Sequence, residues 1–269
     1  SGEWEKEAGL VQGRVVGHRC KTHTVSNTAF RGFGGPQGMM IIERAMDDIA
    51  RHLGMDPLDV RKRNLYGPGR DVTHYGQTVE QHVLPDLIDT LEASSDYRQR
   101  RTEISRFNKE NSVLKRGLAL TPVKFGISFT AKHLNQAGAL VHVYTDGSIH
   151  LNHGGTEMGQ GLYIKVAQVV AAAFQVDLDR VKVAATRTDK VPNTAPTAAS
   201  SGTDLNGMAA LDACEKIKQR LVEFAAETYG VSADSVRFEN NQVHVGEQQF
   251  GWAEFVQQAY MARVSLSSN

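Results

Sequence analysis

Cysteine is scarce in this sequence. Among 269 residues there are only two cysteines, Cys20 and Cys214, and they lie far apart in the chain. This spacing argues against a disulfide framework and against a zinc or iron–sulfur site built from closely spaced cysteines. We therefore expect both to be buried thiols that pack as small apolar side chains.

Net charge and long apolar runs are also missing. Thirty basic and thirty acidic residues cancel, so no excess charge would recruit nucleic acid or an anionic membrane. No run of about 18 apolar residues occurs, and residues 1–7 have neither the basic start nor the apolar centre of a signal peptide. We expect a cytoplasmic protein that binds neither nucleic acid nor membrane.

Glycine, in contrast, is concentrated in loops. Segment 27–37 carries three glycines within four positions, with Arg31 and Phe33 among them and Phe30 just before, and it leads into a strongly patterned helix. Such backbone lets another molecule approach closely, and a helix N-terminus favours anions. The alternative, which the loop alone supports equally well, is a tight turn whose phenylalanines belong to the core.

Two further loops share this design. Segments 154–161 and 192–202 are poor in bulky side chains, and each precedes a helix. Loops of this kind present main-chain N–H groups that suit phosphate or another oxyanion. Neither glycine cluster has the Gly-Lys-Ser/Thr of a phosphate loop. Because 154–161 follows a hairpin strand, we also expect it to lack the βαβ context of a dinucleotide site.

Single residues give weaker signals. Glu157 could be an acid or base, but a carboxylate just before a helix is more often a cap. His150 and His153 are an odd number of positions apart, which would place them on opposite strand faces and makes a shared metal unfavourable. Because phenylalanine is usually buried, Phe33 and Phe129 are expected in the core, although a flat aromatic ligand could stack between such rings.

Hydrophobic periodicity and turn residues predict the elements. Alternation predicts strands, including a hairpin around Asp146 and Gly147, and helical spacing predicts helices with glycine stops at Gly54 and Gly230. The predicted strands are 118–129, 139–144, 149–151, 181–185 and two short ones near 236 and 243. The predicted helices are 37–53, 57–64, 84–91, 162–174, 208–229 and 252–262, with a surface helix possible around 104–107.

Four motifs, in matching order, resemble the molybdenum-binding part of the xanthine dehydrogenase family. The likeness runs from about Gly17 to Ser268. Related aldehyde oxidases share the first and third motifs, whereas the second and fourth are similar to the purine-oxidising branch. The motifs are FRGFGGPQ (30–37), KFGISFT (124–130), GGTEMGQG (154–161) and PTAAS (196–200).

The resemblance implies a hydroxylase that acts on hypoxanthine and xanthine through molybdopterin with molybdenum. It also implies electron transfer through iron–sulfur clusters and FAD to NAD, held by a partner subunit or domain. Position by position, Arg31 and Ala199 would lie in the molybdenum shell, Phe33 and Phe129 would sandwich the purine, and Thr130 would hydrogen-bond it. Arg31 and Ala199 would also bind the cofactor, together with Gly32, Gly159, Gln160, Gly161 and Ala198.

The sequence departs from that family in important places. The family's general-base glutamate lies in a Gly-Glu-Pro-Pro segment that does not occur here, so we name no catalytic residue in this chain. Residues 1–12 do not resemble the family, and the end resembles the beginning of a strand. We expect a piece of a larger subunit that is inactive alone. The alternatives are a non-catalytic binding or assembly module and a related aldehyde oxidase-type hydroxylase.

Pattern and resemblance together predict an α+β fold made of parts of two domains. Residues 1–95 would be the end of a first molybdopterin-binding domain, 96–115 a connection, and 116–269 most of a second such domain. Surfaces that normally meet missing parts would be apolar, so we expect an oligomer or self-association.

Overall fold

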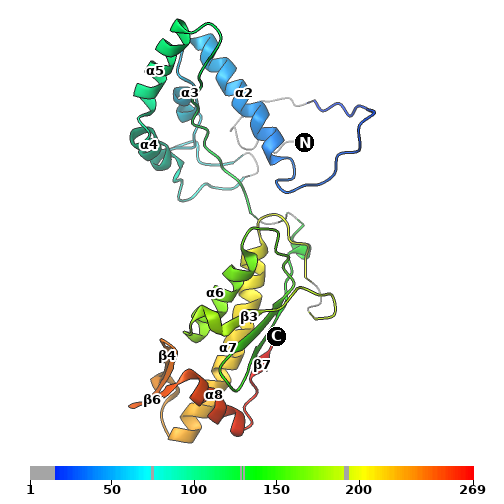
Figure 1. Ribbon diagram of the computed structural model, residues 1–269, viewed down its shortest axis with the longest axis vertical. Helices are drawn as coiled ribbons and strands as arrows, with labels where there is room; N and C mark the ends of the chain where they lie inside the picture. Colours follow the sequence, from blue (N-terminus) through cyan, green and yellow to red (C-terminus); the bar gives the residue numbers. More distant parts are fainter. Residues whose placement is uncertain (1–15, 74–75, 128, 130, 191–193) are drawn as a thin grey trace. The chain divides into compact units, whose positions relative to one another are not determined.

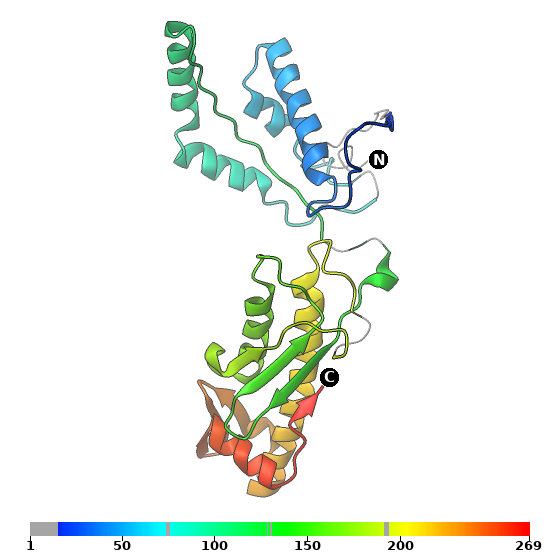
Figure 2. The ribbon, with the colours of Figure 1, turned by 45° about the vertical axis from the view of Figure 1, so that its right-hand side comes forward.

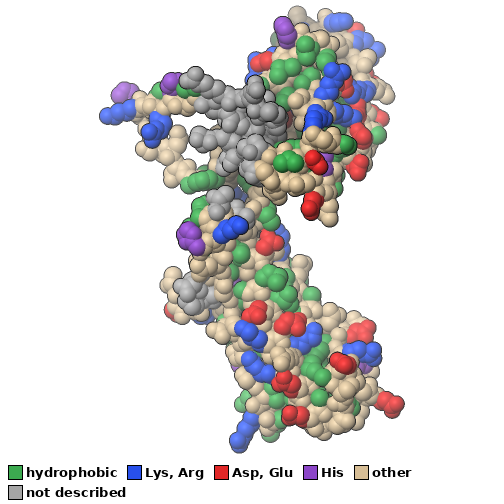
Figure 3. Space-filling view, turned by 180° about the vertical axis from the view of Figure 1, so that it is seen from behind, with side chains coloured by type: hydrophobic (Ala, Val, Ile, Leu, Met, Phe, Trp, Pro, Cys, Tyr) green, Lys and Arg blue, Asp and Glu red, His purple; other side chains and the backbone are tan. Residues whose placement is uncertain are grey.

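The computed structural model describes residues 16–73, 76–127, 129, 131–190 and 194–269. The chain forms two compact units, Ser1–Phe125 and Gly126–Asn269 (Figure 1). Both contain helices, and the second contains two sheets, which confirms the predicted α+β class. Acidic and basic side chains are interspersed over the visible face of each unit (Figure 3). Among the described residues, no helix is sufficiently long and apolar to span a membrane.

In the first unit, helix α2 (Gly35–Leu53) begins at the first glycine loop. Pro36 stands in its first turn, and Gly54 ends it in the left-handed conformation, as predicted. The buried side of α2 is formed by Met46 and Ala50, whereas Ile49 and Leu53 are exposed. The predicted apolar stripe therefore turns only partly toward the core.

Helix α3 (Pro57–Arg63) begins at a side-chain cap. Asp56 Oδ1 accepts a hydrogen bond from the Leu58 N–H at 2.9 Å, as the Asp-Pro pair predicted. Leu58 is fully buried in a small core with Ile88 of α4 (Leu84–Ser94) and Tyr97 of α5 (Tyr97–Glu110). A continuous helix thus occupies most of 96–115, and it belongs to the first unit. The sequence-based domain limits themselves remain a prediction.

The strands predicted within 118–129 are wrong for the residues that the structure describes there, which form no regular element. The large apolar side chains at positions 123, 125, 127 and 129 are between 43% and 60% exposed. Alternation alone does not make a strand, because each strand needs a hydrogen-bonded neighbour. No other described segment pairs with this one.

The second unit is built on a four-stranded sheet of order β3-β2-β1-β7. The predicted hairpin is confirmed: β1 (Ala139–Val143) pairs antiparallel with β2 (Ile149–His153), and Asp146 Oδ1 accepts from the Ser148 N–H in the turn. Strand β7 (Ser267–Ser268) adds to the outer edge of β1. One apolar core runs beneath the sheet.

Strand β2 also pairs with β3 (Val181–Val183), and this pairing is parallel. Helix α6 (Leu162–Phe174) lies between them in sequence, so β2, α6 and β3 form a βαβ unit. The expectation that the second glycine loop lacks this context is therefore wrong. The error arose because β2 has two neighbours, and only the antiparallel one is adjacent in sequence.

Long helix α7 (Gly202–Tyr229) packs against α6, β1 and β7 (Figure 2). A second sheet of β4 (Val236–Glu239), β5 (Gln242–Val245) and β6 (Gln248–Gly251) follows, then helix α8 (Trp252–Met261). Strand β6 was not predicted. Aromatic side chains join these parts, since Trp252 contacts both Phe174 and Phe238.

The two cysteines have different environments. Cys214 is fully buried on α7, as predicted, and burial raises the pKa of its thiol to about 12. Cys20 is exposed, so the prediction of a buried thiol is wrong there. Residues 16–30 carry no regular element and are exposed throughout, which leaves Cys20 without a surface to pack against.

Candidate functional site

Two of the three loops singled out in the sequence adjoin each other in the second unit. Loop 154–161 joins β2 to α6, and loop 184–201 joins β3 to α7. The Thr156 N–H donates to Thr197 Oγ1 at 2.8 Å, which links them directly. Because β2 and β3 are parallel, both loops leave the same edge of the sheet. In parallel sheets ligands bind at this carboxyl edge.

The start of the second glycine loop is held by close packing. A Cβ on Gly154 would lie 2.1 Å from Thr194 Oγ1, and one on Gly155 would lie 2.5 Å from Leu162 Cδ2. Thr186 Oγ1 donates to the Gly155 carbonyl at 2.7 Å. These two glycines are therefore explained by the approach of neighbouring side chains.

His153, at the end of β2, supports this packing. Its Nδ1 accepts a hydrogen bond from the Gly155 N–H at 3.1 Å, and its ring lies edge-on to Tyr163. Burial lowers the pKa of His153, which favours the neutral ring. His150 has the opposite strand parity, as the sequence predicted. The structure places it across from His142 on β1.

Several buried polar atoms around this loop have no hydrogen-bond partner among the described residues. They include Nε2 of His153, Oδ1 of Asn206 and Oγ1 of Thr194. His153 and Asn206 are only 2% and 3% exposed, and both lie against Gly155. Buried polar groups are normally paired, so this region has hydrogen-bonding capacity for water or another ligand.

Glu157 acts as a cap at the N-terminus of α6, which confirms that interpretation. Its Oε1 accepts from the Gly159 N–H at 2.8 Å and from the Gly161 N–H at 3.0 Å. Its Oε2 accepts from the Tyr163 N–H at 3.1 Å. The hydrogen bond from the Tyr163 N–H lowers the pKa of this carboxyl most. The hydrogen bonds from the Gly161 and Gly159 N–H groups lower it further.

Gln160 is hydrogen-bonded within the same loop. Its Oε1 accepts from the Met158 N–H at 2.6 Å, and its Nε2 donates to the Thr156 carbonyl at 2.9 Å. In this loop, side chains of the protein thus accept hydrogen bonds from the N–H groups of residues 155, 156, 158, 159 and 161. It differs from the expected open cradle of amides, because a carboxylate already fills the helix N-terminus.

The third loop contains a strained turn. Ala199 and Ser200 have φ angles of 54° and 56°, in the left-handed region. That region costs a residue with a Cβ about 1–2 kcal/mol. The Ser201 hydroxyl donates to the Ala198 carbonyl at 3.1 Å and closes the turn before α7. Backbone strain of this kind is common at functional sites.

The first glycine loop lies in the first unit and has a similar character. Phe33 has a φ of 44°, and its N–H donates to the Phe30 carbonyl at 2.8 Å. The side chains of Phe33 and Phe30 are 69% and 84% exposed. Phe129, in the second unit, is 43% exposed. The interpretation of Phe33 and Phe129 as core residues is therefore wrong.

The structure brings together some of the predicted site residues. Gly159, Gln160 and Gly161 lie on one of the adjoining loops, and Ala198 and Ala199 lie on the other. The remaining residues are elsewhere: Arg31, Gly32 and Phe33 are in the first unit, and Phe129 lies near the start of the second. Thr130 lies outside the described residues. Their roles toward cofactor, metal and substrate stay predictions.

Sequence reasoning missed the residues that support the two loops. His153, Thr186, Thr194, Thr197 and Asn206 were not singled out for this role. One signal was available: His153 continues the core-facing alternation of Ile149 and Leu151, so it is a polar residue at a core position. The others depend on contacts between segments far apart in sequence.

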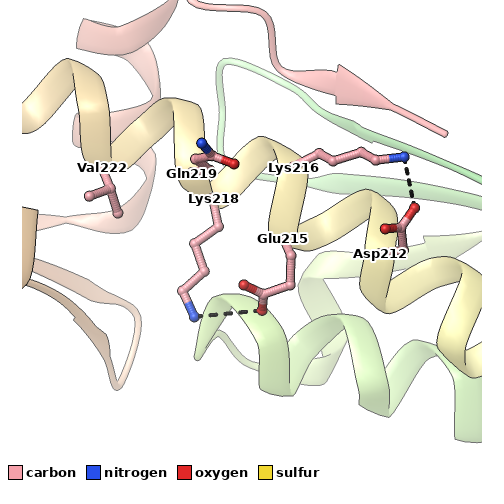
Figure 4. Close-up of a pocket in the computed structure, with 6 residues that line it drawn as sticks. All are labelled: Asp212, Glu215, Lys216, Lys218, Gln219 and Val222. Carbon is pink, nitrogen blue, oxygen red and sulfur yellow. Dashed lines mark ion pairs between the residues drawn. The ribbon is translucent and has the colours of Figure 1, made fainter.

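A hollow of about 410 Å³ on the side of α7 is less suited to a ligand. Figure 4 shows its charged lining residues paired with each other along the helix. Lys216 Nζ lies 2.8 Å from Asp212, and Lys218 Nζ lies 3.9 Å from Glu215. These are exposed helix pairs of the usual kind. No three His, Cys, Asp or Glu side chains gather as possible metal ligands within the part of the chain that the structure describes.

The chain belongs to the molybdopterin cofactor-binding domain family. One domain of this family matches residues 90–269, and a second matches residues 11–65. The predicted cofactor class is therefore confirmed. Xanthine dehydrogenase of Drosophila pseudoobscura pseudoobscura is 48% identical over 255 residues, which cover 95% of this chain and 18% of that protein.

Other relatives agree. Xanthine dehydrogenase/oxidase of Mus musculus is 47% identical over 95% of this chain and 18% of its own length. Xanthine dehydrogenase of Dictyostelium discoideum is 54% identical over 77% of this chain and 15% of its own length. The chain thus spans less than a fifth of the length of each of these three relatives.

Solved structures share the fold. Quinoline 2-oxidoreductase from Pseudomonas putida 86 matches 89% of this chain and 33% of its own, with a TM-score of 0.72 and 21% identity. Aldehyde oxidoreductase from Desulfovibrio gigas matches 89% of this chain and 23% of its own, with a TM-score of 0.60 and 23% identity.

Proposed function

We propose that this chain supplies part of the molybdenum site of a xanthine dehydrogenase, which hydroxylates hypoxanthine and xanthine to urate. The observation that carries the proposal is the adjoining pair of loops, at the carboxyl edge of the parallel strands, in a chain 48% identical to a xanthine dehydrogenase. When bound, molybdopterin supplies the two-electron oxidation of the purine carbon.

The loop residues fit such a cofactor. Gly159, Gln160, Ala198 and Ala199 present small or neutral groups. These loops carry two carboxylates: the charge of Glu157 is compensated by three N–H groups, and Asp189 pairs with Arg187. An anionic pterin phosphate would therefore meet no uncompensated negative charge there. In this proposal Arg31 and Ala199 lie nearest to the metal.

Phe33 and Phe129 are proposed to bind the purine. Each presents an aromatic ring with a large exposed fraction, and a flat heterocycle gains from stacking against such rings. The Phe129 carbonyl accepts from Asn135 Nδ2 at 2.8 Å, which helps to fix that segment. Thr130 is proposed as a hydrogen-bonding neighbour of the same substrate.

Electron transfer would need further parts. A chain with two cysteines cannot hold iron–sulfur clusters, so these and FAD would belong to a partner subunit or domain that passes electrons to NAD. We also propose a cytoplasmic oligomer. The general-base glutamate would come from outside these 269 residues.

Xanthine kinetics of the intact enzyme test the proposal. Phe33→Leu and Phe129→Leu should each raise KM for xanthine about tenfold, because stacking on a base is worth about 1–3 kcal/mol. Molybdenum content should not change. Tyr260→Leu alters an aromatic residue on α8 whose exposure, 56%, lies between those of Phe33 and Phe129, and it should leave KM unchanged. Unaltered KM in both Phe variants would refute the substrate assignment.

The isolated 269-residue chain should form no urate from xanthine, because the general base and the electron acceptors would be absent. Product is measured by urate absorbance with the intact enzyme as the positive control. Steady urate formation by the purified chain would show that it contains its own catalytic machinery, contrary to the proposal.

A further inference from the structure

The turn 159–161 has little tertiary contact to define its shape. Gly159 has a φ of 89°, and nothing lies within 4 Å of the position of a Cβ there. Gly161 has a φ of 74°, and only Ile164 approaches it, at 3.5 Å. Two glycines with so little packing around them would be free to adopt other conformations. Something else must therefore hold this turn.

Glu157 is the group that holds it. Its carboxylate bridges the N–H groups of Gly159, Gly161 and Tyr163, and so fixes both glycines to the first turn of α6. Hydrogen bonds to an ionised acceptor are about twice as strong as neutral ones. The exposed turn thus takes its conformation mainly from Glu157, while the Gln160 side chain is bonded to Met158 and Thr156 just before the turn.

The same arrangement decides which main-chain group the turn can offer to a ligand. The N–H groups of Gly159 and Gly161 are occupied by Glu157, whereas the N–H of Gln160 between them has no partner among the described residues. Behind the loop, the buried His153 and Asn206 also carry unpaired polar atoms. The region therefore retains hydrogen-bonding capacity although the helix N-terminus is filled.

We propose that Glu157 is a positioning residue, whose carboxylate sets the 159–161 turn so that the Gln160 main chain is presented to the pterin cofactor. This inference rests on the proposed function. It differs from a simple phosphate cradle, because the anion at the helix N-terminus is the protein's own carboxylate.

The test is Glu157→Gln in the intact enzyme. Glutamine keeps the size of the side chain, but its NH₂ group would face one of the three N–H donors. Molybdenum and pterin per polypeptide should fall about tenfold at matched cofactor supply, since charged hydrogen bonds contribute about 1.5–3 kcal/mol each. Metal analysis and pterin fluorescence after oxidation measure both.

Asp146→Asn is the matched control. Asp146 accepts from the Ser148 N–H and hydroxyl in the turn at the other end of β2, so the variant removes a similar carboxylate from the same unit. It should lower the melting temperature but keep the cofactor. If Glu157→Gln retains its cofactor, or if Asp146→Asn loses as much, the positioning role is refuted and Glu157 only stabilises the fold.

The role of Glu157 and the proposed function can be refuted independently of each other. A wild-type enzyme that carries pterin but does not oxidise xanthine would refute the xanthine assignment, and the pterin content of Glu157→Gln would still decide the role of Glu157. A wild-type enzyme active on xanthine, with full cofactor content in Glu157→Gln, would refute only the present inference.

Discussion

Gly154 and Gly155 show how single residues determine the path of the second glycine loop. Thr194 lies against the first, and Leu162, Asn206 and His153 surround the second. An added methyl group at either position would enter space that is already filled. The close packing that admits no Cβ is the same packing that joins the loop to α6 and α7.

Gly155→Ala should therefore destabilise the second unit by about 1–3 kcal/mol, because overpacking forces neighbouring side chains from their places. Chemical denaturation followed by circular dichroism measures the change. Gly251→Ala is the control, since nothing lies within 4 Å of its Cβ position and its φ of −63° suits alanine. Equal losses in the two variants would show that the packing at Gly155 is not the cause.

At the scale of elements, Asp56 joins two helices of the first unit, α3 and α5. It caps α3, accepts from the Tyr97 hydroxyl at 3.0 Å, and pairs with Arg101 Nε at 3.1 Å on α5. Burial and the carboxylate together raise the pKa of Tyr97 to about 12. Burial alone would raise the pKa of Asp56, but the hydrogen bonds from Leu58, Tyr97 and Arg101 outweigh it and lower that pKa below its ordinary value.

This shift predicts an acid-sensitive first unit. The folded pKa of Asp56 is below the unfolded one, so its contribution to stability is complete above about pH 4 and is lost as pH falls through the folded pKa. Asp56→Asn should cost about 1–3 kcal/mol at pH 7 and weaken the pH dependence of unfolding below pH 4. Asp48→Asn, an exposed residue on α2, should change stability by no more than about 0.5 kcal/mol. A wild-type acid profile in Asp56→Asn would contradict this account.

Elements defined by local signals were predictable from the sequence. The Asp146-Gly147 turn, the limits of α6 and the glycine stops after α2 and α7 depend on neighbouring residues, and all were confirmed. The parallel pairing of β2 with β3 and the irregular path of the described residues within 118–129 depend on which segments become neighbours. Local pattern contains no such information, so those features could not be predicted correctly.

The candidate site was predictable in part for the same reason. Loop composition pointed to the loops 154–161 and 192–202, and the family resemblance named Gly159, Gln160 and Ala199 within them. A carboxylate before a helix predicted the cap at Glu157. The exposure of Phe33 and the left-handed φ of Ala199 could not be read from residue type, because aromatic residues are usually buried and alanine usually avoids that region.

At the scale of the whole molecule, the chain consists of two compact units with separate cores. The main core lies within 139–266 and includes both sheets, α6, α7 and α8. The cores of the first unit are smaller and lie within 42–120. A core that is complete within one unit should not need the other for folding.

Residues 126–269 expressed alone should therefore fold. We expect the helical circular dichroism signal of α6, α7 and α8 and a single cooperative unfolding transition. The intact 269-residue chain is the reference. A non-cooperative transition, or loss of the helical signal, would show that this core depends on the first unit.

The proposal on which the others depend is that this chain holds molybdopterin through the two adjoining loops of the second unit. Its most direct test is the molybdenum and pterin content of the intact purified enzyme, measured by metal analysis and pterin fluorescence. We expect equimolar molybdenum and pterin with each polypeptide. A folded, pure enzyme that contains neither molybdenum nor pterin would contradict it.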